Sequence, residues 1–384
     1  MTRRKELLLA AASIMISLVL SLSVAEIVLR FLPVTDSMLV VPVTEHDSIY
    51  HYTPNRPFVF SRGWDLAMVN RGRVNNDGWV NNQDYRKDVS TPLLGIIGDS
   101  YIEALMVPYA ETVQGRLAKD LDGKFRVYSF GASGAPLSQY LVWAAYAVHE
   151  YKAKALIINV VGNDFDESHA AYNAFPGFWI YVPDKDGMLH LRLFEFHASR
   201  VRSLLKNSAL ARYLFLNMHI KQTLSDWNWL RAFVLGQEQP KDWSRYAGNT
   251  AVSVDAARID ASLAVIDAFF RDLPKLVGLP ADRITFTMDG FRYPDAAAAG
   301  VGTYFDRMRR AFQEKAEAQG YEVIDLDPVF FNHFRQDDGR FEYPNDNHWN
   351  PVAHVVVADA IMSSKLMKRL YGLRLDEPIR PHND

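Results

Sequence analysis

Five residues have the types and the placement that acyl transfer requires. Ser100, Gly134 and Asn163 each follow a short apolar run. Asp346 and His348 stand shortly before the last apolar helical stretch. A serine hydroxyl attacks an acyl carbonyl when an imidazole accepts its proton and a carboxylate orients that imidazole. The set therefore predicts nucleophilic catalysis through an acyl-serine intermediate.

Three of these residues form the predicted oxyanion hole. We expect Ser100 to be the nucleophile and to offer its backbone N–H, while Gly134 offers a backbone N–H and Asn163 its side-chain amide. Each has a structural alternative, because serine often caps helices and glycine and asparagine often form turns. Gly131 is the better candidate for a turn. The Gly-x-Ser-x-Gly elbow of ordinary α/β-hydrolases is absent, since Ile102 occupies its second glycine position.

His348 is the predicted general base, which takes the Ser100 proton and returns it to the leaving alcohol. Asp346 lies two residues earlier, and in an extended segment such residues face the same side. We therefore expect Asp346 to orient the imidazole. His354, six residues further on, is expected to be a surface or packing residue of the last helix.

Alternating strand-like and helix-like stretches must position these residues. Apolar strand-like runs occupy residues 93–97, 125–130, 155–161, 284–288 and 321–326, and helical patterns occupy residues 113–121, 137–151, 304–319 and 352–371. This alternation predicts an α/β fold, in which helices cover both faces of a parallel sheet. Ligands bind such sheets beyond the carboxyl ends of the strands, where the predicted site residues stand.

The four blocks around Ser100, Gly134, Asn163 and His348 resemble those of the SGNH (GDSL-type) hydrolase superfamily, in the same chain order. The resemblance spans roughly residues 93–371 and implies a flavodoxin-like, three-layer fold that acts on esters without a cofactor. The final Asp-x-His-Trp-Asn block is similar to that of exported, membrane-anchored members associated with polysaccharide O-acetylation. Many superfamily members place the orienting aspartate three residues before the histidine, where this chain has Asn345.

The N-terminus carries the features of a membrane anchor. Three basic residues precede Leu7–Ala25, a stretch of 19 residues without charge. A helix of that length is about 28 Å long, close to the thickness of the hydrocarbon core. We expect residues 1–32 to be an inner-membrane anchor with a cytoplasmic N-terminus and a periplasmic catalytic domain. The alternative is a signal peptide cleaved after the small residues Ser23 and Ala25.

Two further regions are expected. Residues 33–92, rich in proline and turn signals, predict a linker and an irregular lead-in to a hydrolase domain at 93–384. That domain is expected to hold a helical, aromatic insertion at about 165–250, including a helix at 201–216. Phe178, Trp179 and Tyr181 are candidates for the wall of a sugar-binding cleft, with core packing as the alternative. Trp227, Trp229 and Trp243 belong to the same insertion.

Composition narrows the partners, nucleophiles and cofactors that the protein could use. With 42 basic and 45 acidic residues the net charge is −3, which argues against nucleic acid as a partner. The absence of cysteine excludes a thiol nucleophile, and no metal or cofactor motif is present. The expected partners are the membrane, an acylated carbohydrate and a membrane acyltransferase. The alternatives are an inactive glycan-binding or scaffolding module and a lipase or thioesterase.

Overall fold

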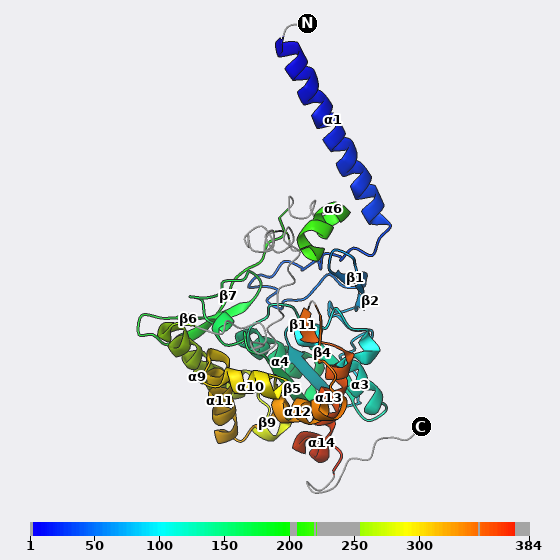
Figure 1. Ribbon diagram of the computed structural model, residues 1–384. Coiled ribbons are helices and arrows are strands. Elements are labelled where there is room, and N and C mark those ends of the chain that lie inside the picture. The colour runs from blue at the N-terminus through cyan, green and yellow to red at the C-terminus, as the bar shows by residue number, and fades with distance from the viewer. Residues whose placement is uncertain (1–2, 200–205, 219, 221–253, 345, 373–384) are drawn as a thin grey trace. The chain divides into compact units, whose positions relative to one another are not determined.

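The computed structural model describes residues 3–199, 206–218, 220, 254–344 and 346–372 (Figure 1). The chain forms two compact units. The first comprises residues 1–39, 57–71 and 198–240, and the second comprises residues 40–56, 72–197 and 241–384. This division differs from the expected boundary at residue 92, because much of the expected lead-in belongs to the unit that contains the central sheet.

That sheet has five parallel strands in the order β4-β3-β5-β8-β9 (Figure 1). Its strands are β3 (Leu93–Gly98), β4 (Arg126–Gly131), β5 (Ala153–Val160), β8 (Ile284–Met288) and β9 (Glu322–Asp325). Every residue of β3 is buried, as expected for a central strand covered on both faces. The order confirms the predicted flavodoxin-like sheet.

Helices cover both faces of the sheet. Leu94 and Ile96 of β3 share a buried cluster with residues of α3 (Val113–Asp120), α12 (Leu326–Asp337) and α13 (Pro351–Met362). The intervening Gly95 instead faces Ala147 of α4, and alternate residues of a strand point to opposite faces. On this second face α4 (Leu137–Tyr151) packs against α9 (Ala256–Val277), and α9 packs against α11 (Tyr304–Ala318).

Shorter elements include the helices α2 (Ser100–Glu103), α10 (Pro294–Gly300) and α14 (Lys365–Leu370). Three two-stranded sheets accompany them: β1 (Arg56–Arg62) with β2 (Met68–Val74), and the antiparallel pairs β6 (Trp179–Pro183) with β7 (Leu189–Leu193) and β10 (Glu342–Tyr343) with β11 (Asp346–Trp349). The single helix expected at 352–371 is divided into α13 and α14, because Ser364 caps a new helix by accepting the Met367 N–H.

The lead-in and the insertion contribute to the core of the second unit. Tyr50 packs against Trp143 of α4 and against Phe178. Tyr85 stacks on Tyr128 of β4, with 3.9 Å between the ring centroids. The described part of the insertion in this unit holds a short 3₁₀ helix (Asp166–Ser168) and the β6–β7 hairpin. The tryptophans at 227, 229 and 243 and the start of the expected helix at 201–216 lie outside the described residues.

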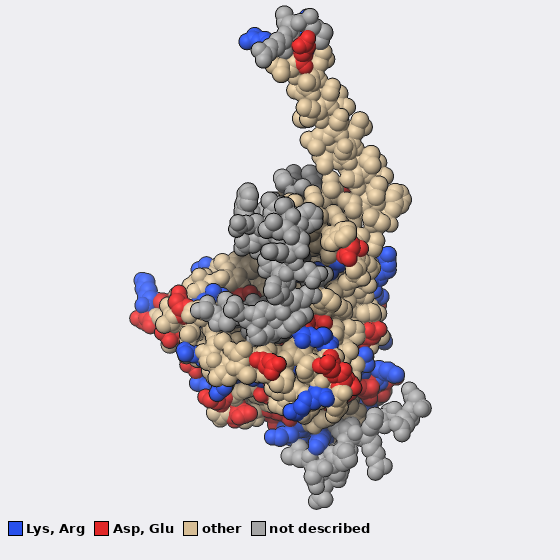
Figure 2. Space-filling view, in the orientation of Figure 1, with Lys and Arg blue, Asp and Glu red and all other residues tan. Residues whose placement is uncertain are grey.

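The first unit contains the apolar helix α1 (Arg3–Arg30), which is long and apolar enough to cross a membrane. No charged residue lies between Glu6 and Glu26. The face of the helix seen in Figure 2 is accordingly tan along most of its length. Near its end, the Glu26 carboxylate accepts hydrogen bonds from the Ser208 hydroxyl at 2.8 Å and from the Leu210 N–H at 2.8 Å. These contacts hold the start of α6 (Ala209–Arg212) against α1.

Candidate active site

Ser100 stands at the carboxyl end of the central strand β3. The strand ends at Gly98, and Asp99 caps α2 by accepting the Tyr101 N–H at 2.9 Å. Asp99 therefore performs the capping role that was the alternative for Ser100, which is the first residue of the helix. The Ser100 side chain is left to make other contacts, although the residue is only 7% exposed.

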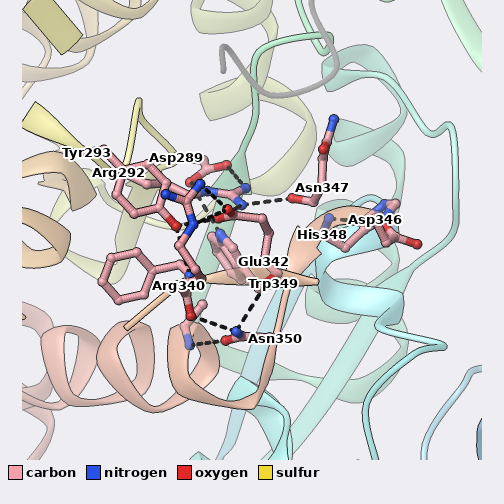
Figure 3. Close-up of polar contacts among 12 residues, drawn as sticks. Asp289, Arg292, Tyr293, Arg340, Glu342, Asp346, Asn347, His348, Trp349 and Asn350 are labelled. Carbon is pink, nitrogen blue, oxygen red and sulfur yellow. Dashed lines mark hydrogen bonds and ion pairs between the residues drawn. The ribbon is translucent and has the colours of Figure 1, made fainter. Parts of the chain in front are cut away.

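Ser100, His348 and Asp346 lie in hydrogen-bond contact. His348 Nε2 is 2.7 Å from Ser100 Oγ. On the other side of the ring, His348 Nδ1 contacts Asp346 Oδ1 (Figure 3). The same Asp346 oxygen accepts the His348 backbone N–H at 3.0 Å. Both residues belong to the extended strand β11, so the spacing of two residues brings the carboxylate to the ring, as the sequence predicted. Asn345 lies outside the described residues.

Asp99 is a second carboxylate beside the Ser100 hydroxyl. Its Oδ2 is 3.3 Å from Ser100 Oγ, a longer contact than that of His348. Burial raises the pKa of Asp99 to about 6, opposed by the Tyr101 N–H and by the charge of His348. Of the two groups, His348 is closer to the hydroxyl, and it alone is hydrogen-bonded to a further carboxylate, Asp346.

The turn after β4 contains the two glycines. Gly134 has φ of +77°, and a Cβ there would meet no atom within 4 Å. Glycine is therefore required by the left-handed backbone, and the space beside it is open. At Gly131 a Cβ would come within 2.9 Å of the Gly98 carbonyl oxygen and 3.1 Å of the Asp99 carbonyl oxygen. Gly131 thus allows the end of β4 to approach the turn that carries Ser100.

Glu103 connects α2 to the turn after β4, and the sequence reasoning missed it. Its Oε2 accepts the Ser133 N–H at 2.9 Å and the Ser133 hydroxyl, while Oε1 accepts the Tyr52 hydroxyl at 2.5 Å. Burial raises the pKa of Glu103, and these hydrogen bonds oppose the rise. Ser133 immediately precedes Gly134, so Glu103 holds the turn that presents the Gly134 N–H. The signal in the sequence is a lone charge within an apolar stretch.

Asn163 follows β5, the other neighbour of β3. It is buried, and its Nδ2 donates to Glu167 Oε2 at 2.8 Å. Burial raises the pKa of Glu167 to about 7. An amide nitrogen carries two hydrogens, so one donor of Asn163 remains for a substrate. The order β4-β3-β5 places the turns of Gly134, Ser100 and Asn163 at adjacent strand ends.

The carboxylates that follow Asn163 have other partners. Asp164 accepts hydrogen bonds from the Tyr140 hydroxyl at 2.8 Å and from the Val161 N–H at 2.8 Å. Asp166 forms an ion pair with Arg258. Within the described residues, no group of three or more His, Asp or Glu side chains is arranged to hold a metal ion.

The aromatic wall expected at Phe178, Trp179 and Tyr181 is corrected by the structure. Phe178 and Tyr181 have no exposed surface. The Tyr181 hydroxyl donates to Asp272 at 3.2 Å, and the half-buried Trp179 donates its indole N–H to the Ser48 carbonyl at 3.1 Å. These side chains stabilise the packing of β6, which was the alternative, and the two buried rings cannot contact a substrate.

Comparisons with known proteins gave structural similarity only. No family model matches the sequence, and no curated protein matches it. LAE5, an alpha/beta hydrolase enzyme from the metagenome of Lake Arreo, aligns with a TM-score of 0.40 and 13% identity over 76% of this chain and 100% of its own. The acetyl xylan esterase AlAXEase aligns with a TM-score of 0.38 and 10% identity over 71% of this chain and 98% of its own. Axe2, an acetylxylan esterase from Geobacillus stearothermophilus, aligns with a TM-score of 0.35 and 13% identity over 77% and 100%.

Proposed function

We propose that this protein is a serine-dependent esterase or acyltransferase. The observation that carries the proposal is the continuous contact from Ser100 Oγ to His348 Nε2 and from His348 Nδ1 to Asp346. A base within 2.7 Å of the hydroxyl, itself oriented by a buried carboxylate, is the arrangement that activates a serine.

The reaction follows from these contacts. As Ser100 Oγ attacks the acyl carbon, His348 Nε2 accepts its proton, and Asp346 stabilises the imidazolium. The backbone N–H groups of Ser100 and Gly134 and the amide of Asn163 stabilise the oxyanion. His348 then protonates the leaving alcohol, and the acyl group remains on Ser100. Finally water or a second hydroxyl compound loses a proton to His348 and attacks the acyl carbon. The bond to Ser100 Oγ breaks, and His348 returns the proton to this oxygen.

We further propose that the substrate carries O-acetyl groups on a carbohydrate outside the cytoplasm. The support is the Asp-x-His-Trp-Asn block at residues 346–350 and its likeness to exported proteins of polysaccharide O-acetylation. Hydrolysis and transfer share the acyl-serine step and differ in whether water or a sugar hydroxyl completes the reaction. A membrane acyltransferase would supply the acyl donor in the transfer reaction. We place the protein in the inner membrane, with the basic residues before Leu7 in the cytoplasm.

The test is fluorophosphonate labelling and p-nitrophenyl acetate cleavage by the full chain. We expect Ser100→Ala to abolish both while the circular dichroism spectrum is unchanged, because no other hydroxyl contacts His348 Nε2 among the described residues. Ser363→Ala, an exposed serine at the end of α13, is the matched control and should retain both. Near-full cleavage by Ser100→Ala would overturn the mechanism, and an unlabelled wild-type protein would favour the inactive binding module.

A second assay distinguishes the two reactions. The enzyme receives p-nitrophenyl acetate with and without an oligosaccharide acceptor, and the products are separated by mass. Transfer predicts acetylated oligosaccharide that increases with acceptor concentration, since an oriented acceptor competes effectively with water. If only free acetate accumulates at every acceptor concentration, the protein is a deacetylase.

A further inference from the structure

A buried arginine lies beside the site without touching the reacting atoms. Arg292 follows β8, has no exposed surface and adopts φ of +65°, a left-handed backbone that is uncommon for arginine. Its backbone N–H donates to Asp327 at 3.0 Å, which fixes this strained turn. Burying a guanidinium is costly unless its charge is paired. Here Asp289 pairs with it, with Oδ2 at 2.7 Å from Nη2 and Oδ1 at 3.3 Å from Nε.

The Arg292 guanidinium forms hydrogen bonds with the residue next to Ser100 and with the residue next to His348. Nη1 donates to the Asn347 carbonyl at 2.8 Å (Figure 3). Nη2 donates to the Tyr101 hydroxyl at 2.9 Å. Tyr101 in turn donates its hydroxyl to the same Asn347 carbonyl at 3.1 Å. Tyr101 immediately follows Ser100, and Asn347 immediately precedes His348. The Arg292 guanidinium, the Tyr101 hydroxyl and the Asn347 carbonyl are thus each hydrogen-bonded to the other two. This triangle of hydrogen bonds links the segment that carries Ser100 to the segment that carries His348.

Asp289 holds the other side of the base. Its Oδ1 accepts the Trp349 indole N–H at 3.2 Å, and the Trp349 ring is fully buried against the edge of the Tyr101 ring at 5.1 Å. His348 thus lies in the chain between Asn347, which is hydrogen-bonded to Arg292, and Trp349, which is hydrogen-bonded to Asp289. The buried Arg292–Asp289 ion pair therefore fixes the residues on both sides of His348. Since a displacement of about 1 Å can cost about 100-fold in rate, such an anchor matters for catalysis.

We propose that Arg292 and Asp289 are positioning residues that set the alignment of Ser100 with His348. The inference rests on the proposed function, because alignment matters only if these two groups react. Arg292 cross-links two segments that are far apart in the chain, and Asp289 keeps the charge of Arg292 paired while it holds Trp349. Neither residue contacts the substrate or the transferred proton.

The test compares Arg292→Met and Arg292→Lys with the wild-type full chain. We expect Arg292→Met to lower kcat for p-nitrophenyl acetate by about 10- to 100-fold with little change in KM. The rate of fluorophosphonate labelling should fall by the same factor. Arg292→Lys retains the positive charge and an ammonium group that can donate hydrogen bonds, so its kcat should lie between those of Arg292→Met and the wild type. Equal kcat in wild type and a folded Arg292→Met variant would overturn the inference.

Arg271→Met is the matched control. Arg271 is a half-buried arginine of α9 that pairs with Asp272 and donates to the Leu189 carbonyl at 2.7 Å, and these contacts involve neither Tyr101, Asn347 nor Asp327. We expect it to lower the melting temperature without a comparable loss of kcat at a temperature where it is folded. A loss equal to that of Arg292→Met would show that the effect is general destabilisation and would overturn the inference.

Tyr101→Phe keeps the test decisive if Arg292→Met does not fold. It removes the hydroxyl of the triangle and keeps the buried ring, so kcat should fall by a few-fold at unchanged KM. An unchanged kcat would count against the inference. If the wild-type protein cleaves no ester, the proposed function fails. The downfield proton resonance of the His348–Asp346 hydrogen bond then still reports the alignment, which the Arg292 substitution should broaden or remove.

Discussion

The tautomer of His348 decides whether Ser100 can react. Nε2 must be free to accept a proton, so Nδ1 must carry one, and an ionised Asp346 enforces this by accepting the Nδ1–H. Asp346 also accepts the backbone N–H of His348, and its carboxylate is almost fully buried. It is therefore fixed with respect to the ring before a substrate arrives.

Asp346→Asn tests this role. An amide can present its NH₂ group to Nδ1 and so stabilise the wrong tautomer, which can cost up to about 10⁴ in kcat. We expect a loss approaching that of His348→Ala, measured as kcat for p-nitrophenyl acetate, with an unchanged circular dichroism spectrum. Activity near that of the wild type would assign the orientation of His348 to another group.

At the scale of elements, two helices are joined through a histidine that takes no part in the reaction. His354 on α13 is buried, and its Nδ1 accepts the Val113 N–H at 3.2 Å, in the first turn of α3. Burial lowers the pKa of His354 to about 3. The sequence suggested a surface or packing residue, and the structure assigns it to packing.

This contact predicts a loss of stability in acid. Unfolded histidine binds a proton below about pH 6.5, whereas folded His354 does so only near pH 3. Between these values the unfolded state holds the extra proton, so the free energy of unfolding falls as pH falls, by up to about 1.4 kcal/mol per pH unit. His354→Asn keeps an acceptor for Val113 and should reduce this slope, as measured by urea unfolding from pH 7 to 4. If the free energy of unfolding of His354→Asn depends on pH as steeply as that of the wild type, the assignment is contradicted. His46→Asn, at an exposed histidine, is the control and should leave this slope unchanged.

At the scale of the molecule, apolar patterning predicted the sheet, and the order of the sequence blocks predicted that Ser100, His348 and Asp346 would lie together. Leu93–Gly98 is too apolar to be anything but a buried strand, and Ser100 directly follows it. Glu103 and Arg292 escaped prediction because the groups that they connect to the site, Ser133 for Glu103 and Tyr101 and Asn347 for Arg292, are remote from them in sequence. Phe178 was misjudged for a related reason, since an aromatic ring serves equally well in a cleft or a core.

The anchor can be tested by removing only its apolar part. A chain lacking residues 7–24 keeps Glu26 and its contacts with Ser208 and Leu210, so the first unit should still fold. We expect this variant to be recovered in the soluble fraction with p-nitrophenyl acetate cleavage intact, while the full chain requires detergent. A full chain that is soluble without detergent, or a mature chain that begins at Glu26, would contradict a retained anchor.

The nucleophile and its base are separated by 248 positions in the chain. Synthesis proceeds from the N-terminus, so Ser100 is made early, and at that stage its hydroxyl is as inert as any other serine. In the proposed mechanism, reactivity begins only when Arg292 and then His348 have been made and have taken their places. A nascent or truncated copy that lacks His348 would therefore not remove acyl groups from its surroundings. The onset of acyl chemistry would then be timed by completion of the fold.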